Sequence, residues 1–386
     1  MTPSRLTLLD AEQNLPFRET TLRAPTGEPT PWTVRAFVLH GGLQEGVQVV
    51  EIDNGSLRFY VLPSRGMGIW KAVSGDVRLG WDSPVRDPVH PSFINLSERG
   101  GLGWLKGFNE WIVRCGLSSM GAPGTDVMMD NNGNEAEEML SLHGRIANLP
   151  ARKVEVEITE KELILRGEVE EVTLFGPALR LRTEVRTAFG SGALILNDTV
   201  TNLGAVSTEH QLLYHINYGE PLLEEGSRFL APFKRMAPRD AHAAVDVKTF
   251  DRYAGPTAGY VEQVYFFELA GQPRTRDTLV MLRNAKGDRA SVVRYRLGDL
   301  PCFSLWKNTA AAEDGYVTGL EPATAYPNPR QVERSHGRVI TLQGGESRST
   351  SLALEVLDSR KAVQAATREI RDLQKGVKPE IHPNPI

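Results

Sequence analysis

Three short segments of the sequence combine residues that exchange protons with residues that favour turns or extended chain. They are Leu142-His143-Gly144-Arg145, the run Leu-Tyr-His-Ile-Asn-Tyr-Gly over residues 213–219, and the run Gly-Leu-Glu-Pro-Ala-Thr-Ala-Tyr-Pro-Asn over residues 319–328. An imidazole and a carboxylate, with ordinary pKa values of about 6.5 and about 4.3, can serve as general acid and general base near neutral pH. His215 and Glu321 supply one of each.

Spacings typical of several other enzyme classes are missing from the sequence. Its eight histidines form no HExxH or other metal-ligand spacing, and Cys115 and Cys302 form no CxxC pair. No GxGxxG segment follows a strand, and there is no Walker-type loop and no GxSxG elbow. The sequence therefore disfavours nucleotide-dependent enzymes, zinc proteases and α/β-hydrolases, and we expect neither a metal nor a cofactor.

In their order and approximate spacing, the three segments resemble those of the aldose 1-epimerases, also called galactose mutarotases. That family has a Leu-His-Gly segment whose histidine binds sugar, a strand whose histidine is the catalytic acid, and a late Glu-Pro segment whose glutamate is the catalytic base. The resemblance spans about residues 45–355 and implies that His143 binds sugar, His215 is the acid and Glu321 is the base. The segment 303–307 also resembles the strand that precedes the family's base.

The sequence departs from the family pattern at several positions. Tyr214 stands where the family often has Asn, and Ala323 stands where Gln is common. The stretch 97–130 is foreign to ordinary mutarotases. These departures bear on the substrate more than on the fold, and they suggest an uncharacterised branch of the superfamily.

The chemistry of anomer exchange fits the two residue types. Opening a pyranose hemiacetal needs a base for the anomeric hydroxyl and an acid for the ring oxygen, and rotation about C1–C2 before closure inverts the anomer. Glu321 precedes Pro322, which holds its backbone extended. His215 is expected in mid-strand, on the face opposite to Tyr214 and Ile216.

Other side chains are candidates for contacting a sugar. Arg65, in the turn over residues 62–69, resembles a sugar-contacting arginine that the family often has early in its chain. Trp306 could stack on the C–H face of a sugar ring, and Asn217 belongs to the same segment as His215. The competing interpretations are a surface or β-bulge position for Arg65 and a core position for Trp306.

Four cations bear on the charge of the sugar. If the segment around residues 101–116 lines the site, Lys106, Arg114, Arg65 and Arg145 would favour an anionic sugar through charge-assisted hydrogen bonds. The alternative is that these side chains belong to a solvated surface. We therefore expect a small sugar as ligand and leave its charge open.

The elements that must position these residues are predicted to be strands. Asn54-Gly55, between two alternating segments, is a strong hairpin signal. Apolar and polar residues alternate over residues 47–52, 57–62, 154–158, 179–187, 194–200, 211–217, 261–269, 278–282, 291–295, 303–306, 338–342 and 349–357. With 36 Gly and 24 Pro as breaks, this pattern predicts an all-β protein, a large antiparallel β-sandwich with a few short helices.

Helical spacing occurs in two places. Apolar residues recur at intervals of three and four over residues 102–115, which predicts a helix over 101–116. The same spacing over residues 363–373 predicts a C-terminal helix that Asp358 caps and Gly376 ends. We expect an extended lead-in with an edge strand over residues 1–32, one sandwich domain over 33–357, and a C-terminal helix and tail over 358–386.

Composition limits the partners and the compartment. The 386 residues include 44 Lys+Arg and 48 Asp+Glu, a net charge of −4, which gives no general attraction to nucleic acid or to anionic membranes. No run approaches the ~20 apolar residues of a membrane span, and the first residues lack an apolar signal segment. Two cysteines in so long a chain favour a reducing compartment. We expect a cytoplasmic protein that binds neither nucleic acid nor membrane, and a homodimer stays open.

Three functions remain compatible with these observations. The first is an isomerase of the aldose 1-epimerase type, with catalysis itself left open. The second is a carbohydrate-binding protein that uses the same sandwich without catalysis, because a fold does not dictate a function. The third is another sugar-processing enzyme, such as a lyase or a different epimerase, that reuses the cleft.

Overall fold

Period-two alternation builds two large sheets in this chain, of which the computed structural model describes residues 4–385. Sheet A has nine strands that pair antiparallel with their neighbours. Their spatial order is β1 (Ser4–Asp10), β11 (Lys153–Ile158), β12 (Glu162–Val172), β13 (Ala178–Ala188), β14 (Ala193–Asn202), β24 (Ser347–Leu357), β20 (Ala290–Arg296), β19 (Asp277–Arg283) and β16 (Arg228–Leu230).

Sheet B has fourteen strands and is antiparallel apart from the pair β17–β25. Its main path runs β2 (Thr20–Arg23), β3 (Thr33–Val38), β4 (Gln48–Asp53), β5 (Leu57–Leu62), β6 (Gly68–Ser74), β8 (Ile112–Leu117), β15 (Thr208–Tyr218), β22 (Val317–Ala323), β21 (Cys302–Asn308), β18 (Gln263–Leu269), β17 (Phe233–Pro238) and β25 (Glu380–Ile381). Off this path, β7 (Val77–Leu79) pairs with β6, and β23 (Ile340–Leu342) pairs with β15.

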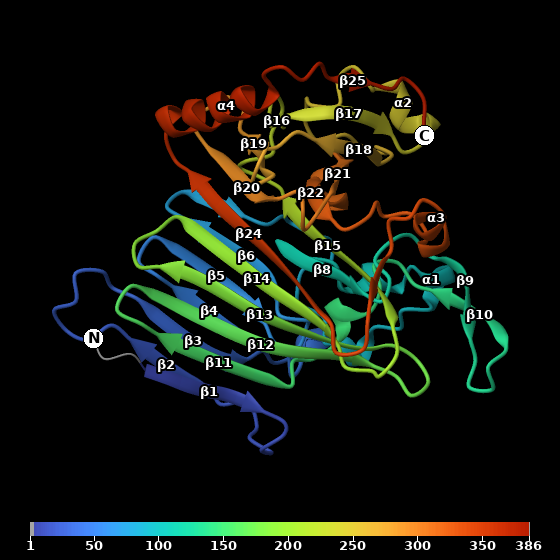
Figure 1. Ribbon diagram of the computed structural model, residues 1–386. Helices are drawn as coiled ribbons and strands as arrows, with labels where there is room; N and C mark the ends of the chain where they lie inside the picture. The colour runs from blue at the N-terminus through green and yellow to red at the C-terminus, as the bar shows by residue number, and fades with distance from the viewer. Residues whose placement is uncertain (1–3, 386) are drawn as a thin grey trace.

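The two sheets pack face to face around one extensive apolar core (Figure 1). Each strand of the sandwich turns alternate residues inward. In β15, Tyr214 and Ile216 point into this core, and the Tyr214 hydroxyl donates to Asp198 Oδ2 of β14 at 2.8 Å. The predicted all-β sandwich is confirmed, and alternation leaves His215 on the face of sheet B that points away from sheet A.

The predicted hairpin at Asn54-Gly55 is present between β4 and β5. Asn54 Oδ1 accepts hydrogen bonds from the backbone N–H groups of Ser56 at 2.8 Å and Leu57 at 2.7 Å. Gly55 adopts a φ of 95°, which a residue with a side chain rarely tolerates. Local turn chemistry therefore sets this register.

The predicted helix over residues 101–116 is wrong. The segment instead forms α1 (Glu98–Gly101), the 3₁₀ turn η3 (Gly103–Gly107) and strand β8. A Cβ on Gly103 would lie 1.8 Å from the Asn95 carbonyl oxygen, so the chain folds back tightly at this glycine. β8 then pairs with β15, and this pairing across the sheet overrides the spacing of three and four.

The predicted C-terminal helix is α4 (Arg360–Gln374), one residue displaced at its start. Ser359 rather than Asp358 is the N-cap, and its side chain accepts from the Ala362 N–H. Val363 and Ile370 pack on β19 and β20, on the outer side of sheet A (Figure 1). Gly376 has a φ of 78°, as expected of a residue that ends a helix.

The remaining elements are short. They are α2 (Ala241–Val245), α3 (Arg330–Ser335), the 3₁₀ turns η1 (Gly42–Gln44), η2 (Pro91–Phe93), η4 (Ile146–Asn148) and η5 (Ala312–Asp314), and a separate hairpin of β9 (Gly124–Met129) and β10 (Glu135–Leu140). Within residues 1–32, β1 and β2 each form one edge of a sheet, and Leu8 is buried in the core. No helix of residues 4–385 is both long and apolar enough to span a bilayer.

Candidate active site

His215 and Glu321 meet on the outer face of sheet B. They project from the neighbouring strands β15 and β22, and His215 Nε2 lies 3.2 Å from Glu321 Oε1. The ladder between β15 and β22 is interrupted between the pairs Leu213–Ala323 and Ile216–Leu320, beside Pro322, which has no N–H to donate. Glu321 lies within β22 at this interruption, and the distance between its Oε1 and His215 Nε2 is at the upper limit of a hydrogen bond.

Asn217 sets the tautomer of His215. The Asn217 Nδ2 group donates to the Glu110 carbonyl at 2.9 Å, so its Oδ1 faces the imidazole. His215 Nδ1 lies 2.6 Å from this Oδ1 and donates its hydrogen to it. Neutral His215 therefore presents the lone pair of Nε2 to Glu321.

His215 and Glu321 are almost completely buried, and burial shifts the pKa of each group in the direction that favours its uncharged form. His215 is 4% exposed and Glu321 is 2% exposed. Burial raises the pKa of Glu321 to about 8, helped by the charge of Glu262 and opposed by Arg239. Burial, together with His143, holds the pKa of His215 well below 6.5. Near neutral pH the two groups thus share one proton, which lies on Glu321.

Aromatic side chains form a cage around this pair. The His215 ring centroid lies 5.0 Å from that of Phe108, 5.2 Å from that of Trp306 and 5.4 Å from that of His143. Trp104 packs edge-on against His143 with centroids 4.6 Å apart. Trp104 and Phe108 belong to the segment that is foreign to ordinary mutarotases, so this segment covers the site.

His143 is held as a neutral ring. Its Nδ1 lies 3.0 Å from the Met120 carbonyl oxygen, to which it donates. Burial lowers the pKa of His143 to about 4, although this hydrogen bond and Glu262 act in the opposite direction. His143 can therefore accept a hydrogen bond at Nε2 over the pH range of most assays.

Trp306 is fixed at the rim of the cage. Its Nε1 donates to Glu262 Oε2 at 2.7 Å, and Arg239 Nη2 donates to Glu262 Oε1 at 3.1 Å. Trp306 and His143 are only partly buried, so they mark a side of the cage that faces solvent. A sugar that stacks on Trp306 would lie next to His215.

Two of the sequence candidates lie in buried ion pairs instead of beside the acid–base pair. Arg65 pairs with Glu110, with Nη2 2.7 Å from Oε1, and it also donates to the carbonyls of Val89 and Gly107 and to Asn148. The Nε–H, both Nη1–H groups and one Nη2–H group of Arg65 thus make hydrogen bonds within the protein. Arg114 spans the interior of the sandwich, where Nη2 donates to Asp198 Oδ1 at 2.9 Å.

The other two cations are on the surface. Lys106 forms an ion pair with Glu98. Arg145 is exposed and lines a groove of about 1240 Å³ beside β9 and β10, whose lining includes neither His215 nor Glu321. Among the residues that the structure describes, no three His, Cys, Asp or Glu side chains cluster as metal ligands would.

A family model described as "Domain of unknown function (DUF4432)" matches residues 44–356. The chain belongs to the DUF4432 family. A full-length match among solved structures is a protein of Klebsiella pneumoniae subsp. pneumoniae MGH 78578, described as a candidate aldose 1-epimerase. It is 35% identical, covers 100% of this chain and 99% of its own, and superposes with a TM-score of 0.93. No protein with a curated description matches the sequence.

More distant structures share the fold of this DUF4432 chain. A galactose mutarotase-like protein of Clostridium acetobutylicum is 14% identical over 84% of this chain and 98% of its own, with a TM-score of 0.59. A galactose 1-epimerase of Lactobacillus acidophilus NCFM is 13% identical over 84% of this chain and 99% of its own, with a TM-score of 0.52. The resemblance to the aldose 1-epimerases, and the sandwich that it implies, are confirmed.

Sequence reasoning missed Gly319 of this DUF4432 protein. A Cβ at this position would lie 2.8 Å from Glu321 Oε1 and 2.9 Å from His215 Cε1, so the glycine leaves the space in which the pair meets. Gly319 lies two residues before Glu321 on the same strand face, and this spacing was the available signal. Phe108 was missed as a cage residue because it was read as one of the apolar positions of a predicted helix, and Trp104, one of several tryptophans considered for stacking on a sugar, was expected in the core.

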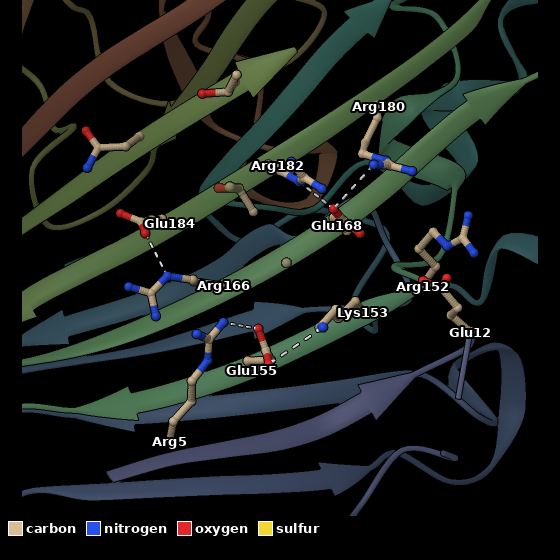
Figure 2. A pocket seen from close by; sticks show the side chains of 14 residues that line it. Arg5, Glu12, Arg152, Lys153, Glu155, Arg166, Glu168, Arg180, Arg182 and Glu184 are labelled. Carbon is tan, nitrogen blue, oxygen red and sulfur yellow. Dashed lines mark hydrogen bonds and ion pairs between the residues drawn. The ribbon is translucent and has the colours of Figure 1, made fainter. Parts of the chain in front are cut away.

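The DUF4432 chain has another large hollow, of about 670 Å³, on the outer face of sheet A. Figure 2 shows that it is lined by alternating cations and carboxylates that contact one another. Arg166 Nε lies 2.7 Å from Glu184 Oε1, and Arg180 Nη2 lies 2.7 Å from Glu170 Oε1. The cations that line the hollow are all paired with carboxylates of the protein, so we place the candidate active site at the buried pair on sheet B.

Proposed function

We propose that this protein binds a sugar against His215 and Glu321 and interconverts its two anomers by opening and closing the ring. The observation that carries the proposal is the contact at 3.2 Å between a carboxyl of raised pKa and an imidazole of lowered pKa inside an aromatic cage. Burial without a neutralising cation raises the pKa of a carboxyl such as Glu321 into the range in which it can exchange protons near neutral pH.

The shared proton supplies the acid for the reaction. Sugar hydroxyls around Glu321 favour its ionised form by hydrogen bonding, and the proton passes to His215 Nε2. Glu321 then takes the proton of the anomeric hydroxyl while His215 gives its proton to the ring oxygen. The C1–O5 bond breaks and a C1=O1 double bond forms. Rotation about C1–C2 and the reverse transfers close the ring to the other anomer and restore both groups.

The cage residues supply binding in this proposal. Trp306 offers a ring face for the C–H groups of a sugar, and His143 offers an acceptor at Nε2. Because the pair is so little exposed, side chains of the cage have to move to admit a ring. Arg65 and Asn217 act here as positioning residues, since Asn217 orients His215 and Arg65 neutralises the adjacent Glu110.

The charges around the pair favour an uncharged sugar. Glu262 and Glu321 are the acidic groups at the site, whereas Arg65, Arg114 and Lys106 pair with carboxylates of the protein. Arg239 at the rim is likewise paired with Glu262, so an anionic sugar would find no unpaired cation among Arg65, Arg114, Lys106 and Arg239. The free and buried Cys115 and Cys302 suit the reducing compartment, such as a cytoplasm, in which we place this activity.

The test is a measurement of anomer equilibration by polarimetry or NMR with a panel of neutral, acidic and phosphorylated aldoses. We expect the protein to accelerate equilibration of at least one neutral aldose. Glu321→Gln and His215→Asn should each lower the rate by about 10²–10⁴-fold, because each removes one of the two proton-transfer groups.

A matched control separates chemistry from folding. Glu168→Gln removes a carboxylate on the outer face of sheet A and should leave the rate unchanged. Glu321 keeps its proton up to about pH 8 in the folded state but only up to about its ordinary value of 4.5 when unfolded. Its burial therefore costs stability above that lower pH, so Glu321→Gln should not lower the melting temperature. A protein that binds a sugar without accelerating any aldose would refute the catalytic proposal.

A further inference from the structure

Ser304 is the cross-strand partner of Glu321 on the side away from His215. The two residues are direct partners in the antiparallel pair of β21 and β22. Directly opposed residues of such a pair point to the same side of the sheet. The Ser304 hydroxyl therefore shares the outer face of sheet B with Glu321, one strand further from His215.

The Ser304 hydroxyl has no partner within the described chain. Ser304 is 0% exposed, and its Oγ makes no hydrogen bond to residues 4–385. Buried hydroxyls are almost always paired, because an unpaired one loses its bonds to water without replacement. Ser291 shows the usual case: it is equally buried in a strand, and its Oγ lies 2.9 Å from the Tyr218 hydroxyl.

A second polar atom near the pair is also without a partner in the described residues. The Trp104 indole N–H is buried and unpaired, and the ring packs on His143 in the cage. Other unpaired buried atoms of the described chain, such as those of Gln211 and Tyr295, lie elsewhere, but Ser304 and Trp104 lie beside the acid–base pair, where a bound ligand can supply the missing hydrogen bonds. A polyhydroxylated, uncharged ligand offers both donors and acceptors to such groups.

The order of the strands indicates which hydroxyl reaches Ser304. Strands β15, β22 and β21 are consecutive, so Glu321 lies between His215 and Ser304 across the sheet. In the proposed reaction His215 serves the ring oxygen and Glu321 serves the anomeric hydroxyl. The next oxygen along the ring, beyond the anomeric one and away from the ring oxygen, is the hydroxyl on C2.

We propose that Ser304 is a sugar-binding residue that hydrogen-bonds the C2 hydroxyl of a neutral aldose. This inference rests on the proposed function and specifies its substrate class. Removing the Ser304 hydroxyl removes one neutral hydrogen bond made equally in the ground state and the transition state. The expected loss is therefore a rise in KM of roughly 2- to 10-fold with kcat unchanged.

The experiment compares Ser304→Ala with the matched control Ser291→Ala. The substrates are the fastest neutral aldose of the panel and its 2-deoxy derivative. The wild type should bind the 2-deoxy sugar more weakly, and Ser304→Ala should raise KM for the parent sugar while leaving KM for the 2-deoxy sugar unchanged. In thermal unfolding, Ser304→Ala should match or exceed the wild type, whereas Ser291→Ala should melt lower because it leaves Tyr218 unpaired.

The outcomes separate this inference from the proposed function. A wild type that accelerates no aldose would refute the proposed function itself. An active wild type that treats the parent and the 2-deoxy sugar alike overturns only the role of Ser304, and this arm needs no variant to fold. The same conclusion follows if Ser304→Ala leaves KM for the parent sugar unchanged, or if it destabilises the protein as much as Ser291→Ala does.

Discussion

The outer faces of the two sheets follow the same two-residue alternation but carry opposite kinds of side chain. On sheet A, Lys, Arg and Glu side chains cover the outer face of β11 to β13, and charges meet opposite charges on neighbouring strands (Figure 2). On sheet B, the equivalent positions around β15 and β22 carry an imidazole, a carboxyl and aromatic rings under a covering segment.

The comparison shows how a functional carboxyl differs from a structural one. Burial raises the pKa of Glu170 on sheet A, but Arg180 and Arg152 outweigh burial and leave that pKa below its ordinary value. For Glu321 on sheet B, burial dominates and the pKa rises to about 8. A carboxyl that is buried without a paired cation keeps its proton near neutral pH, and this proton can then be transferred to another group.

The largest expected effect is a loss of stability on replacing an arginine, and its size should differ between the buried Arg65 and the exposed Arg182 of sheet A. Arg65→Met leaves Glu110 fully buried without a counter-charge, so we expect a loss of about 3–5 kcal/mol in the free energy of unfolding. Arg182→Met, on the exposed face of sheet A, should cost about 1 kcal/mol or less. Chemical denaturation measures both values, and equal losses would show that the Arg65 pair is no more important than a surface pair.

A smaller difference should appear between two glycines. Gly319→Ala pushes a methyl group against both Glu321 and His215, so the rate of anomer exchange should fall by about 10²-fold through misplacement of the pair. Gly298→Ala is the matched control, because a Cβ at this position meets no atom within 4 Å. Full activity of Gly319→Ala would place the reaction somewhere other than at this pair.

The pH dependence of kcat/KM should show which group of the buried pair on sheet B carries the proton. As pH rises through about 8, Glu321 loses the shared proton and kcat/KM should fall about tenfold per pH unit. Below neutral pH the activity should persist past 6.5, because the pKa of His215 is well below that value. A rate profile that declines at 6.5 on the acidic side would contradict this assignment of the proton.

The smallest effect is expected from salt. Raising ionic strength from about 0.1 M to about 1 M screens exposed pairs, so the face of sheet A should lose a fraction of about 1 kcal/mol in stability. Catalysis on a neutral sugar should not change, because neither partner is steered by charge. A kcat/KM that falls steeply with salt would instead indicate an anionic substrate.

Sequence reasoning succeeded where local patterns dominate. The Asn54-Gly55 pair correctly predicted the hairpin between β4 and β5, and the two-residue alternation correctly predicted that His215 and Tyr214 lie on opposite faces of the strand. It failed where the deciding partner is distant in sequence. Nothing near Arg65 or Arg114 reveals that Glu110 and Asp198 neutralise them, 45 and 84 residues away.

The helix predicted over residues 101–116 failed for a related reason. Spacing of three and four among its apolar residues is compatible with a helix, but the glycines of this segment allow tight turns, and β8 gains a full row of hydrogen bonds by joining β15. The role of Gly319 was equally hard to predict, because its lack of a side chain matters only once Glu321 and His215 are packed against it. Such features depend on the assembled sheet and leave little trace in a single sequence.

One chain of contacts described above ties the early turn to the reacting imidazole: Arg65 to Glu110, Glu110 to Asn217, and Asn217 to His215. The reacting groups therefore depend on residues contributed from position 65 to position 321, and no shorter piece of the chain contains them all. Closing such long loops is slow relative to local structure. Recovery of activity during refolding should thus be a late event, and catalysis would report completion of the native topology.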